Sequence, residues 1–290
     1  MADDITPLAS LSLTHVYYNP SDPISMVCAF LSLLPQALCV VYATLLWSTR
    51  EAEVLLMFAG QLACEAINFV LKRLIKEERP RLIVVGNTEG GGGVAVGKGY
   101  GMPSSHAQFT AFWAVALSLF LLIRHRPLGA ARVTTADAAR KDDEGRETNE
   151  STFSPRPGRF AALNASIEKY QHSPWSLAQR AVVSAGAIIV AAAVAGSRVY
   201  LGYHTVRQVV AGSVAGAGCA AAWFAVTYLM RETGMLAWAL ELPLARWFRL
   251  RDLVVGEDFC QAGWEKWEVR RQAALEEERR RLREKEKKAQ

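Results

Sequence analysis

The hydrophobic positions of this chain are gathered into five long blocks that polar segments separate. The blocks cover approximately residues 25–47, 54–72, 106–124, 180–197 and 205–230. Each is close to the roughly 20 apolar residues that a helix needs to cross a bilayer. A shorter apolar piece, 234–248, contains Pro243 and Arg246, which favours a position in the membrane interface. The pattern predicts an all-α fold, a polytopic transmembrane helical bundle of about five spans, with 234–248 as a sixth interfacial or membrane helix.

The polar stretches divide the chain into five parts. These are an N-terminal segment (1–24), two parts of the bundle (25–124 and 178–255), a polar insert (125–177) and a charged tail (256–290). The insert contains several prolines and a dense charged run, so it can bury little apolar surface and we expect it to be disordered. The tail is rich in Glu and Arg and is typical of a solvated helix with ion pairs four residues apart.

Composition supports an integral membrane protein. Hydrophobic residues make up 51% of the chain, and the formal net charge of +5 comes from basic residues between and after the apolar blocks. Membrane topology requires this distribution, whereas a nucleic-acid-binding surface does not, and we expect no nucleic-acid partner. The five cysteines have no paired spacing and are interpreted as small buried hydrophobes. Residues 1–20 lack the basic start of a signal peptide, so the first span is expected to direct insertion.

Three short polar motifs occur at the ends of apolar blocks. The first runs from Lys72 to Arg79-Pro80, the second is Pro103-Ser104-Ser105-His106, and the third is Ser197-Arg198 followed after five residues by His204. Counting membrane crossings places all three on one face and the insert and tail on the other. The insert and tail carry many basic residues, including Arg124 and Arg126, which predicts that their face is cytosolic. The motif face is then lumenal or extracytosolic.

The motifs hold the residue types that phosphoryl transfer requires. That reaction is accelerated mainly by positioning and by neutralising charge on the phosphoryl oxygens. Lys72, Arg79 and Arg198 can supply positive charge, Arg as a planar fork and Lys as a point charge. The helix start at Ser104-Ser105 offers free backbone N–H groups and a hydroxyl, which together form an anion site. These side chains fill the role of a metal, and no carboxylate cluster suited to Mg²⁺ lies near the motifs, so no metal or cofactor is expected.

The two histidines of the motifs are candidates for covalent and acid–base catalysis. A neutral His204 imidazole can attack phosphorus and form a phosphohistidine. His106 can protonate the leaving oxygen and later activate water. Each motif alone has an ordinary structural explanation, as a helix stop or a helix cap. It is improbable that three unrelated helix stops and caps would all lie on one membrane face, so a shared catalytic role explains the pattern better.

A fourth polar group lies inside the second apolar block. Glu65, Asn68 and Lys72 are spaced so that they share one helix face. An ionisable residue in the middle of a span is costly and usually functional. Glu65 is therefore a candidate partner of His204. The simpler alternative is that Glu65 pairs with Lys72 or with another helix as a structural link.

The order and spacing of the three motifs resemble the signature of the type 2 phosphatidic acid phosphatase superfamily. Within it, the segments 101–109 and 197–205 resemble the dolichyldiphosphatase subfamily, as do 12–18 and 67–72. The resemblance covers about 11–125 and 178–255.

The chain departs from the superfamily pattern at two positions. Ser105 replaces a usual Gly, and Gln208 replaces an Asp four residues after the nucleophilic histidine. The resemblance suggests that this subfamily shares both substitutions. A Gln oxygen can fix the tautomer of His204, but it brings no negative charge. What polarises His204 stays open at this point.

The resemblance implies an enzyme that hydrolyses dolichyl (polyprenyl) diphosphate to the monophosphate and inorganic phosphate without a metal. It implies a multi-pass protein of the endoplasmic reticulum membrane whose lumenal active site recycles the carrier lipid for N-glycosylation. One alternative is a broader lipid phosphate phosphatase that acts on phosphatidate or sphingoid phosphates. Another is a non-catalytic protein that binds lipid headgroups, although the chain keeps His106, His204, Arg79 and Arg198. No feature of the sequence indicates an oligomeric state.

Overall fold

The computed structural model describes residues 9–11, 16–82, 94–95, 99–125 and 175–256, together with scattered positions between 263 and 281. The chain divides into two compact units. The first comprises Met1–Arg124 and Ala178–Asp252, and the second comprises His125–Leu177 and Leu253–Gln290. All three polar motifs lie in the first unit.

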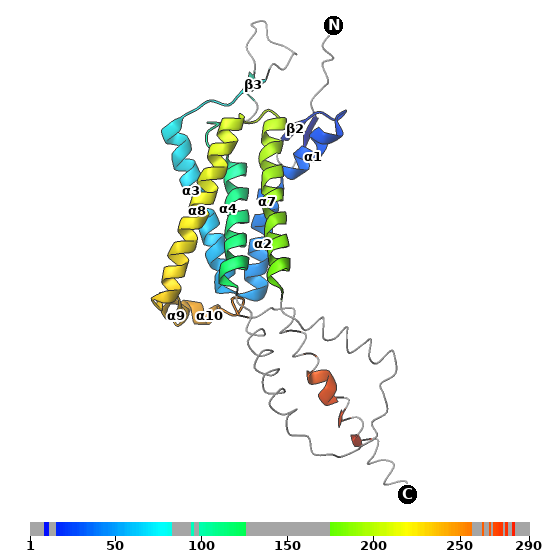
Figure 1. The fold of residues 1–290 in the computed structure, drawn as a ribbon, viewed down its shortest axis with the longest axis vertical. Helices are drawn as coiled ribbons and strands as arrows, with labels where there is room; N and C mark the ends of the chain where they lie inside the picture. The colour runs from blue at the N-terminus through cyan, green and yellow to red at the C-terminus, as the bar shows by residue number, and fades with distance from the viewer. Residues whose placement is uncertain are drawn as a thin grey trace, which may run out of the picture. The chain divides into compact units, whose positions relative to one another are not determined.

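The described part of the first unit is almost entirely helical (Figure 1). Its helices are α1 (Pro23–Leu31), α2 (Leu34–Thr49), α3 (Ala52–Ile75), α4 (Ser105–Leu119) with a π-helical turn η1 (Phe120–Arg124), α7 (Leu177–Tyr200), α8 (Val206–Glu232), α9 (Met235–Leu240) and α10 (Pro243–Trp247). Two short antiparallel pairs accompany them, β1 (Ala9–Leu11) with β2 (Val16–Tyr18) and β3 (Arg81–Leu82) with β4 (Val94–Ala95). The predicted all-helical class is confirmed.

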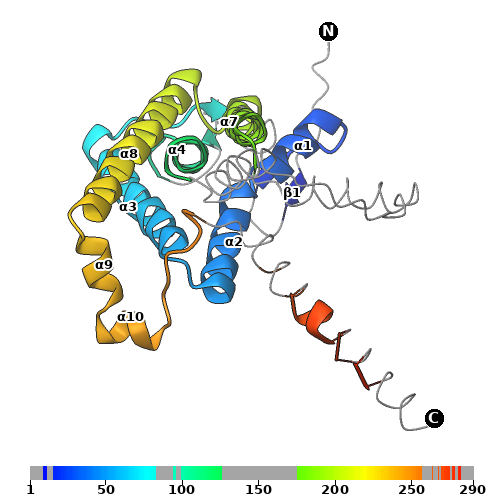
Figure 2. The ribbon, with the colours of Figure 1, turned by 60° about the horizontal axis from the view of Figure 1, so that its bottom comes forward.

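Five apolar helical segments are long enough to cross a membrane, as the sequence predicts. They are Pro23–Thr49, Ala52–Ile75, Ser105–Arg124, Leu177–Tyr200 and Val206–Glu232. The first is not one continuous helix, because it breaks at Ser32 and Leu33 between α1 and α2. The apolar piece 234–248 forms α9 and α10, which are too short to span a bilayer. In Figures 1 and 2 these two helices run across the end of the bundle.

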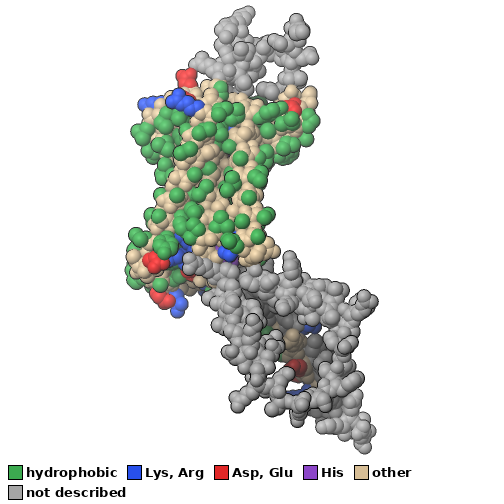
Figure 3. Space-filling model, in the orientation of Figure 1, with side chains coloured by type: hydrophobic (Ala, Val, Ile, Leu, Met, Phe, Trp, Pro, Cys, Tyr) green, Lys and Arg blue, Asp and Glu red, His purple; other side chains and the backbone are tan. Residues whose placement is uncertain are grey.

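Helix α4 is the central element of the bundle. Figures 1 and 2 show α2, α3, α7 and α8 arranged around it. Phe112 of α4 is fully buried in a cluster with Cys64 of α3 and Ala220 of α8. Ala114 of α4 packs with two alanines of α7 in a second cluster. Figure 3 shows hydrophobic side chains over the middle of the bundle and charged ones toward its ends, as a membrane-spanning surface requires.

Helices α4 and α8 touch through their backbones at two glycines. A Cβ on Gly212 would lie 2.6 Å from the Ser104 carbonyl oxygen, and one on Gly216 would lie 2.2 Å from the Gln108 carbonyl oxygen. Small residues permit this close approach between membrane helices. Gly212 and Gly216 therefore face α4, whereas a Cβ on Gly218 would meet open space.

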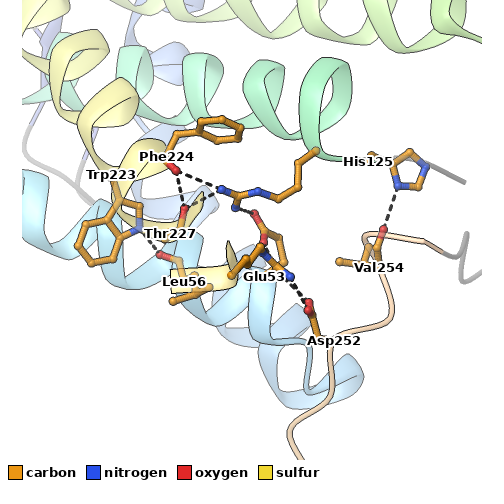
Figure 4. Close-up of polar contacts among 10 residues, drawn as sticks. Glu53, Leu56, His125, Trp223, Phe224, Thr227, Asp252 and Val254 are labelled. Atoms are coloured by element: carbon orange, nitrogen blue, oxygen red, sulfur yellow. Dashed lines mark hydrogen bonds and ion pairs between the residues drawn. The ribbon is translucent and has the colours of Figure 1, made fainter. Parts of the chain in front are cut away.

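A buried ion cluster closes the other end of the bundle (Figure 4). Glu53 at the start of α3 accepts from Arg124 Nη1 at 2.5 Å and from Arg231 Nη2 at 2.6 Å. Arg231 also pairs with Asp252, and Arg124 donates to Thr227 Oγ1 at 2.7 Å. Arg124, which the sequence groups with the basic residues of the insert, lies instead in η1, where it is 8% exposed and paired with Glu53.

In the second unit, the structure describes the charged tail beyond Gly256 only at scattered positions, between 263 and 281. Arg281 Nη2 lies 2.5 Å from Glu277 Oε1, an i,i+4 ion pair of the predicted kind. The predicted disordered insert falls largely on 126–174, which lies outside the described residues.

We predict that Gly216→Ala destabilises the bundle, because the new methyl group must push the α8 and α4 backbones apart. Overpacking costs about 1–3 kcal/mol, and the better helix propensity of Ala returns at most about 1 kcal/mol. Gly218→Ala is the matched control two residues along the same helix, where no such contact exists. Thermal unfolding in detergent should show a lower midpoint for Gly216→Ala alone. Equal midpoints for the two variants would contradict the contact.

Candidate active site

The three motifs meet at one end of the first unit, where α3 and α7 end and α4 and α8 begin (Figure 1). Helix α3 stops because Lys76 adopts a left-handed conformation with φ of 53°, which turns the chain out of the helix. Arg79 then extends back, and its Nε donates to the Gly99 carbonyl oxygen at 3.3 Å. Lys72 interacts electrostatically with both Arg79 and Arg198. The three predicted cations are therefore brought together.

Two buried donors at this end have no hydrogen-bond partner among the described residues. Ser104 is the N-cap of α4, and its Oγ is fully buried and unpaired. Arg198 Nε is also buried and unpaired. Buried polar atoms are nearly always hydrogen-bonded, so unpaired donors need an explanation. A phosphate oxygen beside a helix start would be a suitable acceptor for both.

Arg198 is held rigidly at the end of α7. Its Nη1 donates to Ser32 Oγ at 2.8 Å, and its guanidinium lies 4.1 Å from the centre of the Tyr203 ring. Tyr203 is fixed in turn, because its hydroxyl accepts from the Tyr17 backbone N–H at 2.8 Å. Only 3% of Arg198 is exposed. A cation placed in this way keeps its position when an anion binds.

His204 follows in a tight turn after α7. The Arg198 carbonyl oxygen accepts from the backbone N–H groups of both Tyr203 and His204, which folds the chain back between α7 and α8. His204 is 3% exposed. Burial, followed by the positive charges of Arg79 and Arg198, lowers its pKa to about 3. The ring is therefore neutral at physiological pH, which is the form that can act as a nucleophile.

Gln208 fixes which nitrogen of His204 carries the proton. The Glu78 carbonyl can only accept, so Gln208 Nε2 points to it at 2.8 Å. The Thr205 N–H can only donate, so Gln208 Oε1 points to it at 3.3 Å. That same oxygen lies 3.2 Å from His204 Nδ1, which must therefore carry the hydrogen. The lone pair is left on Nε2, so Gln208 is placed where it can fix the tautomer of His204.

Gln208 has a second role at the start of α8. Thr205 Oγ1 accepts from the Gln208 N–H at 3.3 Å, and Gln208 Oε1 accepts from the Thr205 N–H. This is a capping box that starts α8. The spacing of Thr205 and Gln208 is the sequence signal for it. The residue that orients His204 thus also defines the helix start beside it.

His106, in the first turn of α4, is oriented by a residue outside the motifs. Its Nε2 lies 3.1 Å from the Ser32 carbonyl oxygen. Because a carbonyl only accepts, Nε2 carries the hydrogen and Nδ1 keeps the lone pair. His106 also interacts electrostatically with Arg198 and His204. The two histidines share one site, as the motifs predict.

Three other candidates are grouped with residues of α2, α3 and α4. Asn68 is buried and donates to Gln108 Oε1 at 2.7 Å, so it links α3 to α4. Ser105 and Glu65 line a pocket of about 280 Å³ between α2, α3 and α4, together with His106. Glu65 interacts electrostatically with Lys72, as the structural alternative requires. Glu65 therefore lies on the His106 side of the site.

The structure adds three residues that the motifs did not identify: Ser32, Glu77 and Tyr203. Ser32 lies in the break of the first span and carries no local sequence signal. Glu77 lies inside the first motif, where its charge could have been noticed. Within the described residues, no group of three or more His, Cys, Asp or Glu side chains could hold a metal ion.

Comparison with known proteins assigns the class. The PAP2 superfamily profile matches residues 53–232, which include all three motifs, and the chain belongs to this superfamily. Within it, the chain belongs to the dolichyldiphosphatase family and is a membrane-embedded hydrolase and lipid phosphatase.

Relatives from fungi and animals support this assignment. The chain is 58% identical over 287 residues to a Neurospora crassa protein named "Putative dolichyldiphosphatase", covering 97% of this chain and 99% of that protein. It is 32% identical to human dolichyldiphosphatase 1, covering 83% of this chain and 81% of that protein. It is 26% identical to the Saccharomyces cerevisiae dolichyldiphosphatase, covering 82% and 79%. No solved structure gives a significant match.

We predict that Ser32→Ala weakens catalysis by releasing Arg198 while leaving the backbone carbonyl for His106. A hydrogen bond to a charged group is worth about 1.5–3 kcal/mol, so kcat/KM should fall on the order of tenfold or more. Ser48→Ala removes a hydroxyl from the exposed end of α2 and serves as the control. Steady-state hydrolysis of a lipid phosphate measures both variants. A Ser32→Ala enzyme as active as Ser48→Ala would exclude a role for the hydroxyl.

Proposed function

We propose that this protein hydrolyses dolichyl diphosphate to dolichyl phosphate and inorganic phosphate through a phosphohistidine on His204. The observation that carries the proposal is the buried, neutral His204 ring, whose Nδ1 hydrogen is held by Gln208 at 3.2 Å so that Nε2 bears the lone pair. Arg79 and Arg198 stand beside this ring and are suited to the phosphate that it would attack.

In the first step, Nε2 of His204 attacks the terminal phosphorus. A P–N bond forms, the P–O bond to the bridging oxygen breaks, and dolichyl phosphate leaves with the electron pair of that bond. His106 takes up a proton on Nδ1 when the anionic diphosphate binds beside it, and it donates this proton to the leaving oxygen. Lys72, Arg79 and Arg198 neutralise the equatorial oxygens, and the α4 start with Ser104 and Ser105 adds neutral donors.

In the second step, neutral His106 takes a proton from water through Nδ1. The water oxygen attacks phosphorus, the P–N bond breaks, and its electron pair returns to Nε2 of His204. Inorganic phosphate is released and His106 is again protonated. The Ser32 carbonyl, 3.1 Å from Nε2 of His106, stabilises the protonated ring by accepting its hydrogen.

The names of the relatives support the dolichyl diphosphate substrate, while the site itself addresses only the phosphates. A broader activity on phosphatidate or sphingoid phosphates is the second candidate, because the motifs contact phosphate and not the lipid tail. A role limited to binding headgroups fits less well, since it needs neither an oriented His204 nor an oriented His106.

We place the proposed reaction on the lumenal face of the endoplasmic reticulum membrane, where it would recycle the carrier lipid for N-glycosylation. The crossing order supports a single face for all motifs. The ends of α4 and α7 that flank the insert lie at the opposite end of the bundle from the motifs (Figure 1).

The activity prediction is tested with purified protein in detergent and a panel of three lipids: dolichyl diphosphate, dolichyl phosphate and phosphatidate. Released phosphate is measured with and without EDTA, and His204→Ala controls for contaminating phosphatases. We expect rapid release from the diphosphate, little from the monophosphate, and no effect of EDTA. His204→Ala should lose on the order of 10⁴-fold in rate, because a nucleophile has been removed.

Three results would contradict the proposal. Preferred hydrolysis of phosphatidate would replace the proposed substrate with the broader one. Loss of activity in EDTA and its return with Mg²⁺ would exclude the metal-independent mechanism. A His204→Ala enzyme with a tenth of the wild-type rate would exclude the phosphohistidine at this position.

The sidedness prediction uses two acceptor sequences for N-glycans in the insert, Asn149-Glu150-Ser151 and Asn164-Ala165-Ser166. Both lie outside the described residues. Because oligosaccharide transfer is lumenal, a cytosolic insert should carry no glycan, whereas an acceptor engineered into the loop at Gly90–Gly93 should be modified. Endoglycosidase mobility shifts in eukaryotic membranes report both. Glycan on Asn149 or Asn164 would place the active site on the cytosolic face.

A further inference from the structure

The side chain of Gln208 links His204 to a carboxylate. Its Oε1 accepts from His204 Nδ1 at 3.2 Å, and its Nε2 donates to Glu77 Oε1 at 3.0 Å. The backbone partners on either side, Thr205 and Glu78, leave the amide only one orientation. Gln208 is completely buried, so water does not compete for these bonds. The chain of contacts therefore runs in one direction, from the His204 N–H to the Glu77 carboxylate.

The proposed reaction creates a need for negative charge at this place. When Nε2 of His204 binds phosphorus, the ring becomes a cation. The groups that face it from α3, α4 and α7 are also cationic or neutral: Lys72, Arg79, His106 and Arg198. These cations favour phosphate binding but oppose a positive His204. Gln208 alone cannot offset them, because an amide carries no charge.

We propose that Glu77 is the positioning residue that supplies this negative charge to His204 through the Gln208 amide. The proposal rests on the proposed function, in which His204 is the nucleophile. Hydrogen bonds in a chain polarise one another, so the carboxylate on Nε2 increases the negative charge on Oε1. The phosphohistidine cation is thereby stabilised without a carboxylate in direct contact with the ring, where it would also repel phosphate.

The surrounding backbone holds Glu77 at this distance. Lys76, in its left-handed conformation, ends α3 and starts the return of the chain. The Glu77 carbonyl then accepts from the Gly101 N–H at 2.7 Å, which ties the first motif to the segment before α4. A Cβ at position 101 would lie 2.7 Å from Gln208 Nε2, so any side chain there would displace the amide from its present position. Gly101 therefore leaves room for the Gln208 amide between Glu77 and His204.

Glu65, the other carboxylate considered for this role, has a different environment. It lines the pocket with Ser105 and His106, and its strongest charge partner is Lys72. The hydrogen bonds of His204 lead instead to Glu77.

The test separates charge from structure with an isosteric variant. Glu77→Gln keeps an oxygen that can accept from Gln208 but removes the charge. We expect kcat to fall roughly 10- to 100-fold, a cost typical of losing a group that supports a functional histidine from behind. KM and the inhibition constant of inorganic phosphate should stay within about twofold, because the cations that bind phosphate are untouched. Glu241→Gln, an exposed carboxylate on the opposite end of the bundle, controls for net charge.

A charge exchange provides the second readout. Gln208→Glu alone places two carboxylates, Glu77 and the new one, in contact, and their repulsion should make this variant poorly active. Glu77→Gln with Gln208→Glu restores one carboxylate and one amide, and we expect the double variant to exceed Gln208→Glu at least tenfold in kcat. A rescue of this kind is not expected if Glu77 only supports the fold.

The reference substrate is whichever lipid phosphate the wild-type enzyme hydrolyses fastest. A preference for phosphatidate would then correct the proposed substrate and leave the role of Glu77 to be judged on that lipid. A Glu77→Gln enzyme with wild-type kcat would overturn the role of Glu77 while the proposed function stands. A double variant no better than Gln208→Glu would overturn it as well.

Discussion

The close contact between α4 and α8 is the constraint on which the rest of the structure depends. Gly212 and Gly216 remove the side chains that would keep these two helices apart, so backbone meets backbone. The Ser104 N–H can then donate to the Gln208 carbonyl oxygen at 3.1 Å, which sets the start of α4 beside the first turn of α8. Two helix N-termini that begin together offer an anion an unusually dense set of N–H groups.

The polar groups of the bundle are segregated into two ends with different tasks. At one end, Glu53 and Asp252 neutralise Arg124 and Arg231, and Glu53 ties α3, η1 and α8 together. Breaking a buried pair of this kind leaves an uncompensated charge, so the cluster favours a single arrangement of the helices. At the other end, Lys72, Arg79 and Arg198 lie close enough to act on one another electrostatically. One end pairs its cations with carboxylates, whereas the other gathers cations that are suited to an anionic ligand.

The site must satisfy two opposing electrostatic demands. Cations are needed to hold phosphate, yet burial and these cations together lower the pKa of His204 to about 3 and oppose any positive charge on it. A neutral ring favours attack, but the phosphohistidine of the proposed reaction is a cation. The amide of Gln208 separates the two demands, because it orients His204 directly while the carboxylate of Glu77 stays one hydrogen bond farther away.

The sequence by itself determined the helical class, the five spans and the meeting of three motifs on one face, because hydrophobic blocks of bilayer length and the crossing count depend only on order along the chain. It also indicated that Gln208 would hold His204. Only the tertiary structure decided that Glu65 lines a pocket with His106, that Arg124 is buried against Glu53, that Ser32 contacts His106, and that Glu77 accepts from Gln208. These facts depend on the rotation and depth of each helix against its neighbours, which side-chain packing sets and periodicity does not encode.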